Sequence, residues 1–176
     1  MQRYKIVFGG RIGAGKSKAI QSISEIPVFA TEALNTDEAA HSKLLTTVGI
    51  DYGEFTIDDQ TKIGLYGTPG QQRFSFMWPL IAQGALGVII LVDHSGPDPL
   101  GDLELYLNAF SGEDRTIVIG VTHMDVGNTC SLKQYRDWQT KNNKQHPVFA
   151  VDARKRSDVL LLIEAIIASL EVQLLS

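Results

Sequence analysis

The chain has 176 residues, of which 44% are hydrophobic and 20% charged, and a formal net charge of −4 at pH 7. This length suits one globular domain with its own core, and the acidic balance disfavours nucleic acid and anionic membranes as main partners. One cysteine, Cys130, excludes an internal disulfide and favours a reducing compartment. The longest apolar runs are too short to span a membrane and neither end carries a lipidation signal, so we expect a cytoplasmic protein without a stable membrane anchor.

Short apolar strands alternate with helical segments, which predicts an α/β fold with helices on both faces of a mostly parallel sheet. Six strands are expected, at 3–10, 49–57, 61–67, 86–93, 115–122 and 146–152. Five helices are expected, at 17–25, 71–83, 98–110, 131–141 and 157–174. Pro79 should kink the second helix or end its first part. The strands flanking 58–60 form an antiparallel hairpin, and 27–46 is expected to be an irregular, mobile loop. In such sheets ligands bind at the carboxyl ends of the strands.

The stretch "GRIGAGKS" (10–17), between the first strand and the first helix, fits the phosphate-binding loop pattern. Glycines let backbone N–H groups approach a phosphate closely, and a helix N-terminus favours negative charge. Lys16 should place its charge on the β- and γ-phosphates, and Ser17 should offer a hydroxyl to magnesium. An ordinary glycine-rich turn is the alternative. The expected phosphate-end contacts are Gly10, Arg11, Ile12, Gly13, Ala14, Gly15, Lys16, Ser17 and Lys18.

Two later segments indicate a guanine base. "THMD" (122–125) follows a buried strand, and the Asp125 carboxylate there can accept both the N1–H and the 2-amino group of guanine, a donor pair that adenine lacks. "VDAR" (151–154) closes another strand, where the N–H of Ala153 can reach guanine O6. A plain turn or helix-cap role for Asp125 is the alternative. The expected base-end contacts are Thr122, His123, Asp125, Asp152, Ala153 and Arg154.

The order of these segments resembles that of the Ras-like small GTPases over nearly the whole chain. The stretch "LYGTPGQQRFSFMW" (65–78) is most similar to the bacterial branch of MglA and conservon-type GTPases. The resemblance implies one G domain over 1–176, with the three-layer P-loop NTPase fold, a mixed, mostly parallel six-stranded sheet and helices on both faces. It also implies a signalling switch that binds GTP/GDP with magnesium and hydrolyses GTP.

The resemblance also implies roles for the switch residues. Thr47, or alternatively Thr46, supplies the second hydroxyl on magnesium, Gly70 donates its N–H to the γ-phosphate, and Gln71 orients the attacking water. Arg11 or Arg73 could supply a cation to the γ-phosphate, although ion-paired surface arginines are the commoner case. The expected catalytic residues are Lys16, Thr47, Gln71 and Arg73, and the expected magnesium ligands are Ser17 and Thr47.

Three departures from the family pattern bear on activity. Gly67 stands where the family carries an aspartate that holds magnesium through water, and Asp93 or Asp51 could compensate, although both suit turns. Ile12 crowds the space beside the γ-phosphate, where relatives keep glycine, which predicts slow hydrolysis. Thr122 and His123 replace asparagine and lysine, which should loosen base binding. A nucleotide-bound scaffold with little or no hydrolysis is therefore the alternative, and an ATP-using kinase is a third.

The segment 74–80 is rich in large apolar side chains just after Gln71. A helix of this length cannot bury all of them against one sheet face, so some should remain exposed, and exposed aromatic clusters mark partner sites. A wholly buried helix is the alternative. The family resemblance suggests a protein effector or regulator, such as a roadblock-type dimer that docks on both switches.

Overall fold

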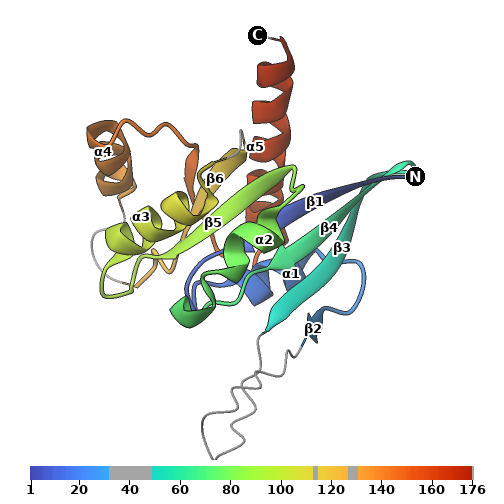
Figure 1. Ribbon diagram of the computed structural model, residues 1–176, viewed down its shortest axis with the longest axis horizontal. Coiled ribbons are helices and arrows are strands. Elements are labelled where there is room, and N and C mark those ends of the chain that lie inside the picture. The colour runs from blue at the N-terminus through green and yellow to red at the C-terminus, as the bar shows by residue number, and fades with distance from the viewer. Residues whose placement is uncertain (32–48, 113–114, 127–130, 176) are drawn as a thin grey trace, which may run out of the picture.

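In the part of the chain that the structure describes, seven strands form one sheet in the order β2-β3-β4-β1-β5-β6-β7 (Figure 1). The computed structural model describes residues 1–31, 49–112, 115–126 and 131–175. The strands are β1 (Gln2–Gly9), β2 (Phe29–Thr31), β3 (Ile50–Asp58), β4 (Thr61–Gly67), β5 (Gly87–Asp93), β6 (Thr116–Thr122) and β7 (Val148–Ala150). β1, β4, β5, β6 and β7 pair in parallel, whereas β2 and β3 are antiparallel to their neighbours. The predicted mixed, mostly parallel α/β class is confirmed.

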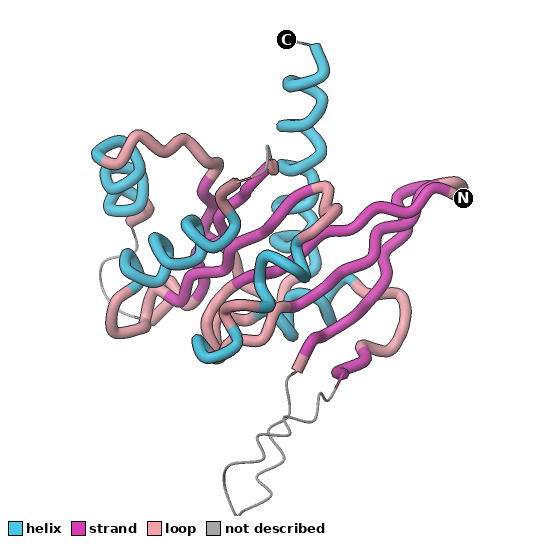
Figure 2. Tube along the Cα trace, in the orientation of Figure 1, coloured by secondary structure: helices cyan, strands magenta, loops and turns pink. Residues whose placement is uncertain are grey.

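Helices cover both faces of the sheet (Figure 2). They are α1 (Lys16–Ile23), α2 (Met77–Ala82), α3 (Pro99–Phe110), α4 (Lys133–Lys141) and α5 (Arg156–Leu175). α1 and α5 pack on one face around a core that includes Ile20 and Leu162, while α2, α3 and α4 bury Trp78, Tyr106 and Tyr135 on the other. Within the described residues, no helix combines the length and apolarity needed to cross a membrane.

The sheet has one strand more than the sequence predicted. Residues 29–31, inside the segment expected to be irregular, pair with β3 as the short edge strand β2. Three residues with no alternating pattern give no periodic signal, and their pairing comes from the neighbouring strand. The rest of the proposed mobile loop lies outside the described residues.

The helix predicted at 71–83 is divided into two parts. A 3-10 helix covers Gln72–Phe74, and α2 starts only at Met77. Pro79 lies in the first turn of α2, where its missing N–H has no helical partner to lose. The proline therefore fixes where α2 begins, in keeping with the predicted interruption.

β3 and β4 form the expected hairpin, with a register shift between Thr56 and Asp58. Beyond this irregularity Asp51 lies opposite Gly67. A Cβ built on Gly67 would lie 3.2 Å from Asp51 Oδ2 and 3.2 Å from Ile20 of α1. Because side chains alternate between faces, the shift decides that Asp51 faces α1 and the phosphate loop.

Candidate nucleotide-binding site

The phosphate-loop sequence joins β1 to α1, as predicted. Gly10 has a φ of +150°, and a Cβ there would lie 2.5 Å from the Leu91 carbonyl oxygen, so the turn after β1 requires glycine. Gly15 caps α1 with a φ of +106°. The free N–H groups of the first turn of α1 therefore lie directly behind a glycine turn, an arrangement that favours anions.

Lys16 is the buried cation of this loop, with 7% of its surface exposed. Its Nζ donates hydrogen bonds to the carbonyl oxygens of Gly10, at 2.5 Å, and Arg11, at 2.9 Å. Burial lowers the pKa of Lys16 to about 8, while the nearby Asp51 carboxylate acts in the opposite direction. A bound phosphate would favour the charged form of this amine.

A cavity of about 1070 Å³ lies at the carboxyl ends of the parallel strands. Lys16 and Asp125, far apart in the sequence, both line it. The predicted site residues on its wall are Ile12, Gly13, Gly15, Lys16, Ser17, Lys18, Gly70, Thr122, His123, Asp125, Asp152, Ala153 and Arg154. Gly10 and Ala14 are buried parts of the same loop.

The phosphate loop and the two predicted base-binding loops are in direct contact. The Thr122 hydroxyl at the end of β6 donates to the Ala14 carbonyl at 2.9 Å. A Cβ on Gly15 would lie 2.9 Å from the Cβ of Ala153 after β7, so these two backbones pack closely. The Thr122 hydrogen bond therefore links the loop that follows β6 to the phosphate loop. Together the two contacts fix the spacing between the two ends of the cavity.

Side chains around Asp125 form local pairs. His123 Nδ1 lies 3.0 Å from Asp93 Oδ1, at the end of β5. Arg154 makes a two-pronged contact with Asp152, with Nε–Oδ1 and Nη2–Oδ2 distances of 2.9 and 2.8 Å. The hydrogen bonds from Arg154 hold the pKa of Asp152 well below its usual range. Asp152 is therefore engaged as the ion-pair partner of Arg154.

Asp51 occupies the space opened by Gly67. Its Oδ2 accepts a hydrogen bond from the Ser17 hydroxyl. Asp51 and Ser17 both line the cavity. The carboxylate that the family pattern places on the strand before "TPGQ" is thus supplied from the opposite strand of the hairpin. Asp93, the other residue considered for this role, is engaged with Ser95 and His123.

Gly70 packs directly against the phosphate loop. A Cβ on Gly70 would lie 2.6 Å from the backbone nitrogen of Ile12 and 2.9 Å from Cγ1 of Ile12. The isoleucine side chain is itself 65% exposed. Ile12 and Gly70 therefore lie side by side on the wall of the cavity, and crowding of the γ-phosphate by Ile12 stays a prediction.

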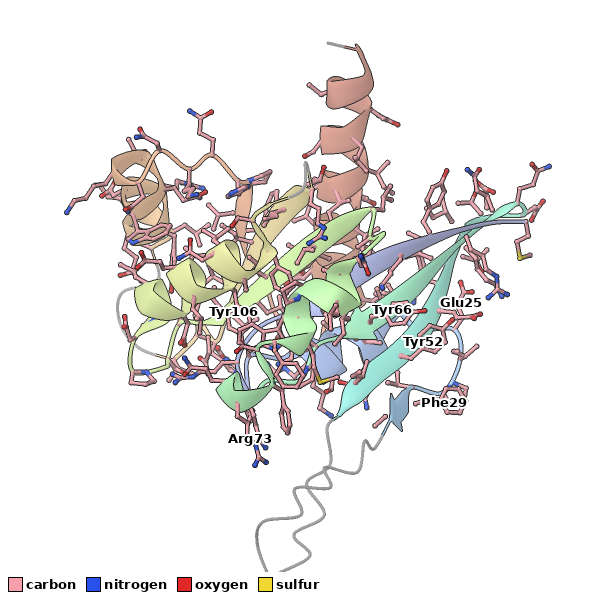
Figure 3. The ribbon with its side chains drawn as sticks, viewed as in Figure 1. Glu25, Phe29, Tyr52, Tyr66, Arg73 and Tyr106 are labelled. Atoms are coloured by element: carbon pink, nitrogen blue, oxygen red, sulfur yellow. The ribbon has the colours of Figure 1, made fainter. Side chains whose placement is uncertain are left out.

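Three residues proposed for catalysis do not line the cavity. Gln71 Oε1 accepts a hydrogen bond of 2.6 Å from Arg73 Nε, and Arg73 points away from the domain (Figure 3). Arg11 lies 3.4 Å from both carboxylate oxygens of Asp102 in α3. Arg11 is thus in an ion pair, and Arg73 is bonded to the neutral side chain of Gln71. Thr46 and Thr47 lie outside the described residues.

Comparison with known proteins identifies the superfamily. No protein-family model matches the chain. Ras-related protein Rab-18 of Lymnaea stagnalis is 26% identical over 160 residues, which make up 88% of this chain and 72% of that protein. Ras-related protein Rab-11B of Dictyostelium discoideum is 30% identical over 144 residues, or 80% of this chain and 59% of that protein. The chain belongs to the Ras-like small GTPase superfamily. The bacterial MglA and conservon-type branch stays a prediction.

A solved structure shares the fold of this Ras-like protein. The G domain of the T. maritima FeoB iron transporter is 17% identical, with a TM-score of 0.65 over 95% of this chain and 98% of that domain. Among the curated relatives, the chain spans about half of Rab-18-B of Danio rerio, matching 46% of its length at 31% identity.

The cavity of this Ras-like protein includes residues that the sequence did not single out. They are Gly49, Thr68, Met124, Val126, Ala150, Val151, Lys155 and Asp158. Asp158, in the first turn of α5, accepts a hydrogen bond of 2.9 Å from the N–H of Asp152 and so holds the loop that follows β7 against the helix. Its position shortly after "DAR" at a predicted helix start was the available signal.

Replacing Asp51 with asparagine should lower the pKa of Lys16 further below its value of about 8, because the Asp51 carboxylate favours the ammonium form. Side-chain NMR of Lys16 during a pH titration of the nucleotide-free protein measures this. Asp137→Asn, on the surface of α4, is the control and should leave the pKa of Lys16 unchanged. An unchanged or raised Lys16 pKa in Asp51→Asn would contradict the coupling.

Proposed function

We propose that this protein is a guanine-nucleotide switch that binds GTP with magnesium, hydrolyses it slowly and signals to a protein partner. The observation that carries the proposal is the single cavity lined by both Lys16 and Asp125. In this arrangement Lys16 and the first N–H groups of α1 hold the phosphates, and Asp125 accepts from guanine N1–H and the 2-amino group. Ala153 lies beside the base, and His123 packs across it.

The residues around Ser17 suit magnesium. This cation prefers oxygen ligands and is usually bound through one or two carboxylates together with substrate phosphates. The Ser17 hydroxyl and the Asp51 carboxylate meet these needs at the phosphate end of the cavity. In our proposal Ser17 and Thr47 bind the ion directly, and Asp51 orients its water ligands. Magnesium, when bound, neutralises charge on the β- and γ-phosphates.

Asp51→Asn should raise the magnesium concentration needed for half-maximal retention of bound GDP by about tenfold, because an amide holds metal-bound water less well than a carboxylate. Release of a fluorescent GDP across a magnesium titration measures this. Asp93→Asn is the matched control, since both aspartates were alternatives in the sequence, and it should change the requirement little. Equal shifts in the two variants would assign the role to neither residue.

Hydrolysis would proceed by in-line attack of water on the γ-phosphorus, with cleavage of the bond to the bridging oxygen and release of GDP and phosphate. Lys16 and backbone amides stabilise the charge that develops. Gln71 is the residue proposed to orient the water, and it must first leave Arg73 and turn toward the cavity. This rearrangement and the contact of Ile12 with Gly70 both favour a slow reaction.

A second candidate function is a guanine-nucleotide-bound scaffold that hydrolyses little or nothing. The observation that favours it is the pair Gln71–Arg73, which keeps the proposed water-orienting side chain outside the cavity. In that case the bound nucleotide would stabilise the fold and the partner surface without turnover.

Single-turnover GTP hydrolysis separates the two functions. For the switch, the parent should convert bound GTP to GDP, and Gln71→Ala should slow this roughly tenfold or more, because it removes the group that positions water. Gln72→Ala, at the next residue and the first of the 3-10 helix, is the control and should retain the parent rate. Intact GTP in every sample would favour the scaffold, and a parental rate in Gln71→Ala would remove that residue from the mechanism.

Exposed apolar side chains beside the switch support a protein partner. Phe76 is 68% exposed and Leu80 is 64% exposed, whereas Phe74 and Trp78 of the same segment are buried. The helix is therefore not wholly buried, and two large apolar groups face solvent within ten residues of Gly70 and Gln71 along the chain. We propose this surface as the contact for an effector or regulator in the cytoplasm, with a roadblock-type dimer as the candidate.

A further inference from the structure

Trp78 holds the peptide group that precedes Gly70. The indole is buried, with 1% of the residue exposed, in the first turn of α2. Its Nε1–H donates a hydrogen bond of 2.7 Å to the carbonyl oxygen of Pro69. This contact closes the chain between the end of β4 and α2 into a loop.

Tyr106 of α3 fixes the indole from the other side. The two ring centroids are 4.4 Å apart with an interplanar angle of 26°, a stacked arrangement. Tyr106 is 1% exposed and stacks in turn on Phe110. One helical turn earlier on α3, Asp102 contacts Arg11 of the phosphate loop. Helix α3 therefore contacts the phosphate loop through Asp102, and through Tyr106 it contacts the tryptophan that binds the peptide before Gly70.

The Pro69–Gly70 peptide bond links the direction of the Pro69 carbonyl to that of the Gly70 N–H. The Pro69 carbonyl and the Gly70 N–H belong to one planar trans peptide unit, so the two groups point in opposite directions. Fixing the carbonyl toward Trp78 therefore fixes the N–H away from it. Gly70 lines the cavity and packs on Ile12. Its N–H can therefore point at a bound phosphate only over a small range of orientations of the Pro69–Gly70 peptide.

We propose that Trp78 is a positioning residue that aims the Gly70 N–H at the γ-phosphate, and so sets the preference for GTP over GDP. This inference rests on the proposed function, in which Gly70 contacts the γ-phosphate. GDP lacks that phosphate and does not use the Gly70 N–H. Loss of the indole N–H donor should therefore weaken the binding of GTP and leave the binding of GDP unchanged.

Trp78→Phe tests this directly, because it keeps an aromatic ring against Tyr106 and removes the N–H. The affinity for a non-hydrolysable GTP analogue should fall about 3- to 10-fold, the usual worth of one hydrogen bond, while the affinity for GDP stays within about twofold. Trp138→Phe, the other tryptophan of the chain, is the control and should change neither affinity. Equal losses of affinity for both nucleotides would show that Trp78 supports only the fold. Unchanged affinity for both nucleotides would also overturn the proposal.

Indole NMR provides a measurement that needs no folded Trp78 variant. The chain has two tryptophans, so Trp138→Phe assigns the Nε1–H resonance of Trp78. Engagement of the Gly70 N–H polarises the shared peptide unit and should strengthen the Trp78 hydrogen bond, which moves this resonance with the GTP analogue and not with GDP. The same shift with both nucleotides would contradict the proposal. A parent protein that binds neither nucleotide would instead refute the proposed function, and the inference would fall with it.

Discussion

The site depends on the contact between the phosphate loop and the ends of β6 and β7. The Thr122 hydroxyl binds the Ala14 carbonyl, and Gly15 packs against Ala153 at a distance that leaves no room for a side chain. These contacts set the distance between the end of the cavity that holds Lys16 and the end that holds the Asp125 carboxylate. In the proposed function, the phosphates of a guanine nucleotide occupy the first end and its two base donors meet the Asp125 carboxylate at the other. The fold thus contributes to function mainly by holding two local motifs at a fixed spacing.

Charge balance at the phosphate end is achieved in an unusual way. The strand before "TPGQ" carries glycine at the position where Ras-like proteins hold an aspartate, and the missing carboxylate is supplied by Asp51 across the hairpin. Asp51 then has two neighbours, the hydroxyl of Ser17 and the ammonium group of Lys16, whose pKa it influences. In the proposed function, Asp51 therefore takes the part of the aspartate that is absent at Gly67.

Local motifs were predictable from the sequence, and long-range register was not. The phosphate loop, the alternation of strands and helices and the interruption at Pro79 follow from residue types over short windows. The position of Asp51 opposite Gly67 depends on an irregularity near Thr56, which has no clear composition signal. The strand at 29–31 forms only because β3 offers an edge, and the outward orientation of Gln71 depends on its contact with Arg73. Each of these features is set by a partner distant from the local pattern or by a single side-chain contact.

Recognition of guanine by Asp125 is tested by calorimetric titration of the nucleotide-free protein and its Asp125→Asn variant with GTP and ATP. We expect the parent to bind GTP more tightly than ATP. Asp125→Asn should lose roughly 10- to 100-fold in GTP affinity while ATP binding hardly changes, because an amide cannot accept both guanine donors. ATP bound as tightly as GTP by the parent, or unchanged GTP affinity in the variant, would contradict it.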